Sequence, residues 1–149
     1  MTTPPENSFH STLKVYVIRL KPKDDLKKSL QDFAVEHKIK AAIILTCVGS
    51  VEGCNLRFAN AKTAHTLSAY FEIVSLVGTL SDTACHLHLS VSKTTGEAIG
   101  GHLMEGNIIY TTAEVAIGVL PDLVFERIAD DTYGFHELKI STQEIRKIK

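Results

Sequence analysis

The sequence predicts an α+β fold, a largely antiparallel β-sheet covered by one main α-helix. Only one stretch, residues 24–37, repeats apolar residues at helical spacing, among them Leu26, Leu30 and Ala34. Most of the remaining chain consists of short runs rich in β-branched and aromatic residues, separated by turn-forming residues. One helix among many strands favours a sheet with a single covered face.

The first half of the chain predicts a strand, a helix and two further strands. Residues 13–20 are rich in β-branched and aromatic side chains and predict a strand. Asp24 is the expected N-cap of the helix, whose other face carries lysines and a glutamine. Residues 41–48 are almost all apolar, which is typical of a central strand covered on both faces. A glycine-containing turn then leads to a short strand, 55–59.

The second half predicts strands only. Residues 60–68 are expected to form a loop, and 70–80 a long strand with many β-branched residues. A hairpin follows, and then an apolar strand at 113–120 that ends before a proline. Two short runs at 124–127 and 137–140 predict two further strands.

Length and composition predict a single domain. The chain has 149 residues, of which 44% are hydrophobic, enough for one core. We expect a flexible N-terminal tail at 1–10, one domain at 11–141 and a basic C-terminal tail at 142–149. No internal repeat divides the domain.

The charge balance predicts which partners the chain lacks. Its 16 basic residues are offset by 17 acidic ones, so nothing indicates a nucleic-acid surface, and there is no AT-hook sequence. No apolar run approaches the roughly 20 residues that cross a membrane.

The odd number of cysteines, Cys47, Cys54 and Cys85, indicates buried thiols rather than disulfides. We therefore expect an intracellular, cytoplasmic protein without a secretion signal.

A hairpin that carries three of the seven histidines is the most informative feature. Residues 85–91 predict a strand, and because side chains alternate between the faces of a strand, His86 and His88 share a face. Residues 93–97 suit a three-residue hairpin loop, a type I turn followed by Gly96 in the left-handed conformation.

This loop sets the register of the returning strand. Counting outward from it places His102 opposite His88, and Met104 opposite His86. Directly paired residues share a face, so the three imidazoles converge on one side of the hairpin. A two-residue loop would shift the register by one position and send His102 to the other face.

Three converging imidazoles predict a metal site formed by His86, His88 and His102. Three protein nitrogens with one open position are typical of catalytic zinc, although nickel, copper and iron also accept imidazole. The alternative is that these histidines are ordinary polar residues of a half-exposed strand. A cupin also places His-x-His on a strand, but it needs a glutamate a few residues later, and here the first is Glu97, beyond the turn.

The segments around the histidines also carry a family resemblance. They are Gly49-Ser50-Val51, the strand at 71–80, His-Leu-His-Leu-Ser at 86–90, Gly-Gly-His-Leu-Met-Glu-Gly at 100–106 and Thr-Thr-Ala-Glu-Val at 111–115. From about residue 14 to 138 the chain resembles the PPC domain (plants and prokaryotes conserved, DUF296). The resemblance implies a homotrimer of α/β subunits, and some stand-alone members resemble metal-binding proteins through this histidine set.

Plant members of this family attach the domain to AT-hooks that bind A·T-rich DNA. Their characteristic strand reads Gly-Arg-Phe-Glu-Ile, whereas this chain has Ala69-Tyr70-Phe71-Glu72-Ile73. A partner contact made by that arginine therefore does not carry over.

Several other polar residues are candidates for the site. Glu105 and Glu72 are candidate proton acceptors. However, the alternation of side chains along a strand places Glu105 on the other face of the sheet from His102, and its carboxylate could instead cap a turn. Glu114 is expected to pair across a subunit interface. His65, in the predicted loop, could come from a neighbouring subunit. The remaining histidines are expected to be surface residues: His10, His37 and His136.

Two main function classes follow. The first is a trimeric metal-binding module that interacts with a partner or a small ligand near the metal. The second is a zinc-dependent enzyme in which a water held by three histidines attacks a small substrate. A DNA-associated regulatory role ranks third, since it depends on the plant relatives and the charge balance opposes it.

Overall fold

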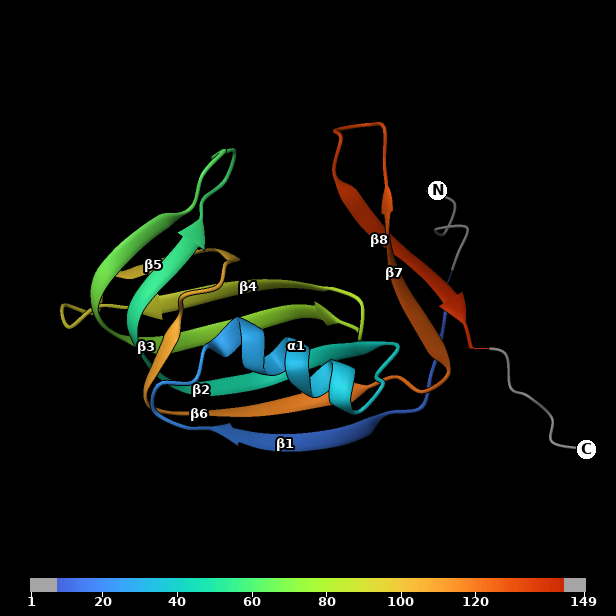
Figure 1. Cartoon of the computed structure of the whole chain (residues 1–149), viewed down its shortest axis with the longest axis horizontal. Coiled ribbons are helices and arrows are strands. Elements are labelled where there is room, and N and C mark those ends of the chain that lie inside the picture. Colours follow the sequence, from blue (N-terminus) through green and yellow to red (C-terminus); the bar gives the residue numbers. More distant parts are fainter. Residues whose placement is uncertain (1–7, 144–149) are drawn as a thin grey trace, which may run out of the picture.

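The computed structural model describes residues 8–143. A six-stranded antiparallel sheet has the order β1-β6-β2-β3-β4-β5, a separate hairpin pairs β7 with β8, and α1 lies across the large sheet (Figure 1). The elements are β1 Lys14–Leu20, α1 Leu26–Glu36, β2 Ala42–Arg57, β3 His65–Leu80, β4 Cys85–Ser92, β5 Ala98–Leu103, β6 Ile108–Val119, β7 Leu123–Ala129 and β8 His136–Thr142. The predicted α+β class is confirmed.

The long strand β2 curls the sheet and closes part of it. Along 42–52 its edge pairs with β6, whereas further on the pairs Leu56–Leu103 and Arg57–His102 join it to β5. Because β2 also pairs with β3, β3 with β4 and β4 with β5, these four strands form a closed ring. Closure brings Arg57 beside the histidine hairpin.

Helix α1 covers the inner face of the sheet and buries Leu26, Leu30 and Ala34. Asp25 is its N-cap: its backbone is extended, and its side chain accepts a hydrogen bond from the Lys28 amide. The prediction of Asp24 was wrong by one residue, because the Asp24 carboxylate instead accepts from the amide of Lys21, in the preceding turn. Among the described residues, no helix is long and apolar enough to span a membrane.

The core lies between α1 and the inner face, where alternate residues of each strand are buried. The outer face remains exposed although much of it is apolar. Its exposed apolar residues on β1, β2 and β3 include Val15, Val17, Val48, Val74 and Val77, with exposed fractions from 50% to 75%. Several exposed apolar residues on one face of a sheet are typical of an interface.

Three predicted element boundaries were wrong. The strands expected at 41–48 and 55–59 are one strand, because Gly49 and Gly53 accompany register shifts without ending β2. Strand β3 begins at His65, so the connecting loop is shorter than expected, and β6 begins at Ile108. In each case pairing with a distant strand extends the element beyond what its local sequence indicates.

The two short strands expected near the C-terminal end exist as β7 and β8, each somewhat longer than predicted. They form their own two-stranded sheet. Residues 1–7 and 144–149 fall outside the described part, so most of both predicted tails cannot be compared with the structure.

Candidate metal centre

The hairpin between β4 and β5 has the predicted loop and register. The Gly96 amide donates to the Lys93 carbonyl, the Lys93 amide donates to the Glu97 carbonyl, and Gly96 has φ of 81°. His88 lies opposite His102, as counted from the sequence. The predicted pairing of His86 with Met104 is absent, because β5 ends at Leu103 and the next amide, that of Met104, donates to the Asn55 carbonyl.

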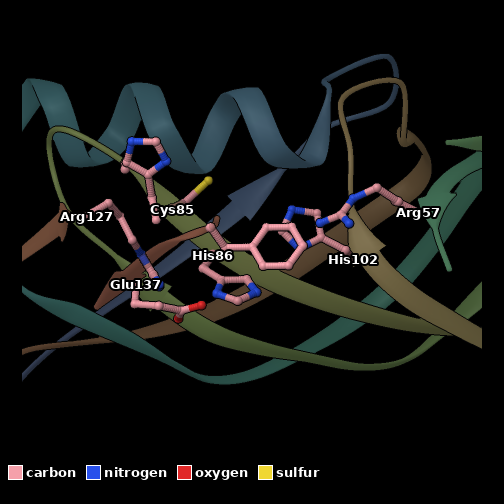
Figure 2. A pocket seen from close by; sticks show the side chains of 9 residues that line it. Arg57, Cys85, His86, His102, Arg127 and Glu137 are labelled. Atoms are coloured by element: carbon pink, nitrogen blue, oxygen red, sulfur yellow. The ribbon is translucent and has the colours of Figure 1, made fainter. Parts of the chain in front are cut away.

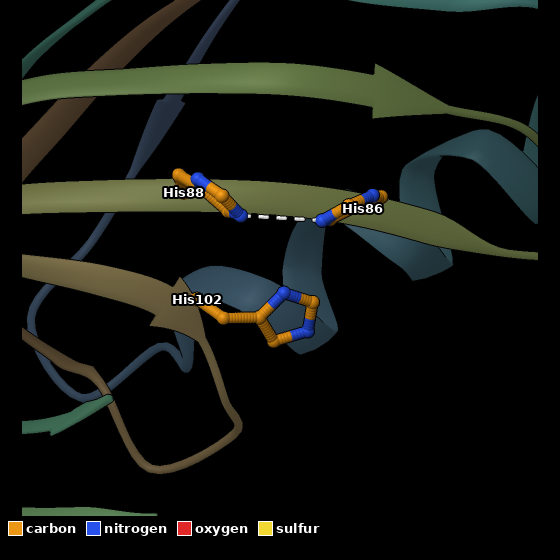
Figure 3. A group of neighbouring side chains, drawn as sticks. All are labelled: His86, His88 and His102. Carbon is orange, nitrogen blue, oxygen red and sulfur yellow. Dashed lines mark hydrogen bonds between the residues drawn. The ribbon is translucent and has the colours of Figure 1, made fainter. Parts of the chain in front are cut away.

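The three imidazoles converge on the outer face of the sheet (Figure 3). The Nε2 atoms of His86 and His88 are 3.2 Å apart, and one ring nitrogen from each of His86, His88 and His102 lies within 4.8 Å of the others. Two zinc–nitrogen bonds of about 2.0–2.1 Å at a tetrahedral angle would separate their nitrogens by about 3.3 Å. The first pair therefore already has the required spacing, and the third nitrogen lies within 4.8 Å of both.

The surroundings keep two of these rings, those of His86 and His102, neutral. Burial, together with the neighbouring His86 and the Arg57 guanidinium, lowers the pKa of His102 to about 4. The pKa of His86 is also lowered, first by burial and then by the positive charge of Arg127. Neutral imidazole is the form that binds metal, so at neutral pH no proton needs to leave these two rings first.

A hollow of about 490 Å³ lies between the histidines and the terminal hairpin. His86 and His102 line it from the sheet, Arg57 lines it from the end of β2, and Arg127 and Glu137 line it from β7 and β8. In Figure 2 the Arg127 and Arg57 side chains lie on opposite sides of His86. His86 also lines two adjoining hollows, so the triad lies where three depressions meet.

Sequence reasoning missed Arg57, Arg127 and Glu137. No local pattern links them to the histidines, because Arg57 arrives by closure of the strand ring, and the other two by packing of the terminal hairpin. His136, expected to be an isolated surface residue, is exposed but lines the same hollow.

The two acidic candidates lie away from this hollow. Glu105 lines a different depression beside α1, together with Lys27, Lys28 and other residues. Glu72 is exposed on β3 and pairs with Ser92, at the opposite end of β4 from His86. The expectation of strand parity, that Glu105 faces away from His102, agrees with this placement.

The other predicted residues occupy exposed positions. His65 is the first residue of β3, where its ring stacks on Phe58 with 5.0 Å between centroids. His37 caps the end of α1, and its ring packs against Phe33 at 4.3 Å. Glu114 lies opposite Arg19 on neighbouring strands of the outer face. His10 is exposed.

The described structure contains no disulfide, and all three cysteines are free. Cys47 and Cys54 are buried as predicted, and burial raises the pKa of each thiol to about 11. Cys85 is only half-buried and lines the hollow next to His86. Burial also raises the pKa of the Cys85 thiol.

The sequence model of the Plants and Prokaryotes Conserved (PCC) domain matches residues 7–121. The chain belongs to this family. The predicted resemblance to the PPC domain, another abbreviation of the same name, is therefore confirmed. The match ends before β7, so the terminal hairpin that supplies Arg127 and Glu137 lies outside it.

Solved structures share the fold. A hypothetical protein from Salmonella enterica is 39% identical with a TM-score of 0.89, and the alignment covers 92% of this chain and 99% of that one. A metal-containing protein from Archaeoglobus fulgidus is 27% identical with a TM-score of 0.78, over 89% of this chain and 99% of that one. A candidate DNA-binding protein from Bacteroides thetaiotaomicron is 23% identical with a TM-score of 0.73, over 87% of this chain and 96% of that one. At this identity the likeness is one of fold only.

Among curated proteins, the chain is similar to the bifunctional protein GlmU of a Synechococcus strain. The two are 40% identical over 129 residues, which is 87% of this chain and 20% of the relative. The chain thus spans about a fifth of the length of the curated relatives it matches.

Proposed function

We propose that this domain binds one first-row transition metal, best suited by zinc, through His86, His88 and His102. The observation that carries the proposal is the convergence of three ring nitrogens within 4.8 Å, two of them at 3.2 Å. The lowered pKa values of His86 and His102 support it, because both rings are neutral at physiological pH. A relative described as metal-containing adds independent support.

Titration of metal-free protein with zinc tests this proposal. We expect a stoichiometry of about one zinc per chain, with little proton release from His86 and His102 at pH 7. Binding that is non-saturable, or that is unchanged when all three histidines are replaced by alanine, would contradict it.

We further propose that three copies assemble through the exposed apolar outer face of the sheet. Val17 on β1 is 75% exposed and Val77 on β3 is 53% exposed, and burying such residues against another copy is favourable. Val77 pairs with His88, so this face reaches the histidine centre. In the assembly, the metal would lie beside a subunit interface.

Light scattering at low micromolar concentration is expected to report about three times the 16.4 kDa chain mass. Val17→Lys should lower that mass, since a lysine placed in an apolar interface must be desolvated. Val35→Lys is the matched control. Val35 is 54% exposed but lies on α1, away from the outer face, so the mass of the assembly should not change in this variant. A monomeric wild-type protein would contradict the assembly.

We propose that the isolated domain does not recognise duplex DNA, although a structural neighbour is a candidate DNA-binding protein. The 16 basic and 17 acidic residues leave no net positive charge to displace counterions. In fluorescence anisotropy at physiological salt, A·T-rich and G·C-rich duplexes should both bind more weakly than micromolar. Submicromolar affinity with a preference for one duplex would move the DNA-associated role to first place.

A zinc-dependent enzyme is the second candidate, and the position of Glu137 favours it. A metal in this site would supply Lewis-acid activation of a small substrate. Glu137 lines the hollow next to His86, so its carboxylate is a candidate proton acceptor there, whereas Glu105 lines a separate depression. The enzyme reading thus depends on the terminal hairpin, and Glu137 replaces Glu105 as its proposed base.

A further inference from the structure

We propose that the hollow between the terminal hairpin and the histidines binds a small organic anion, through a carboxylate or phosphoryl group held by Arg57 and Arg127. This inference deepens the proposed function, because the anion would lie next to the metal. It names the class of ligand, which the metal site alone does not.

The two arginines are the first argument. Both are half-buried and both line the hollow, yet no carboxylate among the described residues lies within ion-pair distance of either guanidinium. Arg127 donates one hydrogen bond, from Nη2 to the Thr79 hydroxyl at 2.7 Å. A guanidinium has five N–H donors in a planar fork that matches carboxylate and phosphate oxygens, so most of this capacity is available to a ligand.

The local charge is the second argument. Arg57 and Arg127 line the same hollow as His86 and His102, so two positive charges lie beside the triad. A divalent metal on the triad would add further positive charge, whereas Glu137 is the one carboxylate among the residues that line the hollow. An anionic ligand would offset this excess of positive charge, because it is attracted to the metal and to both guanidinium groups.

The size and walls of the hollow restrict the ligand. A volume of about 490 Å³ lies within the range of small-molecule sites. Ala84 and Phe135 add apolar surface beside the charged groups, which suits an organic acid or a phosphorylated metabolite. Arg127 and Phe135 lie outside the part that the family model matches, so the hairpin's share of this hollow is not implied by membership of the family.

Calorimetric titration with inorganic phosphate and with malonate, on metal-free and zinc-loaded protein, tests the proposal. We expect saturable binding of at least one of the two anions, and tighter binding when zinc is present. The anion that binds more tightly identifies the bound group of the natural ligand as phosphoryl or carboxylate. Arg57→Gln and Arg127→Gln should each weaken it about tenfold or more, as expected for the loss of charge-assisted hydrogen bonds.

Arg19→Gln is the matched control. Like Arg127, Arg19 donates to a threonine hydroxyl, that of Thr112 at 3.0 Å, but it lies on β1 and does not line the hollow. Its replacement should leave anion binding unchanged. Absence of binding for both anions, or equal weakening in all three variants, would overturn the proposal.

Metal content, measured on the same samples, separates this test from that of the metal site. Full zinc content with lost anion binding in Arg57→Gln and Arg127→Gln supports an anion site beside an intact metal centre. Protein that takes up no zinc but still binds the anion through these arginines would refute the metal assignment alone. Protein that binds zinc and neither anion would refute the anion site alone.

Discussion

Replacing Gly78 by alanine is expected to destabilise the folded protein by about 3–5 kcal/mol, a large part of the total stability of a small domain. Gly78 lies on β3 directly beside β4, with φ of +142°. A Cβ atom there would lie 2.0 Å from the His86 carbonyl oxygen and 2.9 Å from the Leu87 Cα. Both are backbone atoms of β4, so β4 itself would have to move, and His86 with it.

Urea unfolding measures this effect, and Gly96→Ala is the matched control. Gly96 also has positive φ, +81°, but in the hairpin loop no atom lies within 4 Å of the position that a Cβ atom would occupy. Alanine at this position should therefore cost only the conformational strain, about 1 kcal/mol. Equal effects at both positions would show that close approach of β3 and β4 at the histidine site is not as described.

Zinc is expected to stabilise the domain strongly at pH 7 and hardly at all near pH 4. A ligand at 100 times its dissociation constant stabilises the state it binds by about 2.7 kcal/mol. Protonated imidazole cannot bind metal, and because the pKa of His102 is lowered to about 4, its ring stays competent well below the usual histidine range near 6.5. The zinc-dependent stabilisation should therefore decline as the pH falls and be lost by about pH 4, where the His102 ring takes up a proton.

The metal-free protein should show its own pH dependence. The folded-state pKa values of His86 and His102 are lower than those of the unfolded chain, so the unfolded state binds more protons at mildly acidic pH. The contribution of these two histidines to the free energy of unfolding is therefore fully present above about pH 6.5, and it decreases as the pH falls towards 4. Thermal unfolding with and without zinc across this range measures both effects. Zinc stabilisation that is independent of pH, or that is equal in His102→Ala, would contradict them.

The part of the site that the sequence predicted correctly depends on short-range geometry. The loop at 93–97 sets the pairing of His88 with His102, and the two-residue period of a strand places His86 beside them. The helix and its buried face likewise follow from local periodicity, with an N-cap one residue later than expected because two adjacent aspartates compete for the role.

The part that the sequence did not predict depends on long-range packing. Arg57 reaches the site only because β2 remains one strand through Gly49 and Gly53 and then pairs with β5. Arg127 and Glu137 reach it because the terminal hairpin packs against Ala41 and Ile43 at the start of β2, and Arg127 bonds to Thr79 of β3. No spacing along the chain encodes this. Glu105 is near His102 in sequence, but it lines a depression beside α1 instead.

Elemental analysis of protein purified without an affinity tag tests the central claim most directly. Wild-type protein is expected to carry about one first-row transition metal per chain, and His86→Ala, His88→Ala and His102→Ala are each expected to lose most of it. His10→Ala is the matched control, because His10 is exposed, lies outside the triad and should leave the metal content unchanged. Equal metal content in the wild type and all four variants would contradict the assignment of the three histidines as ligands.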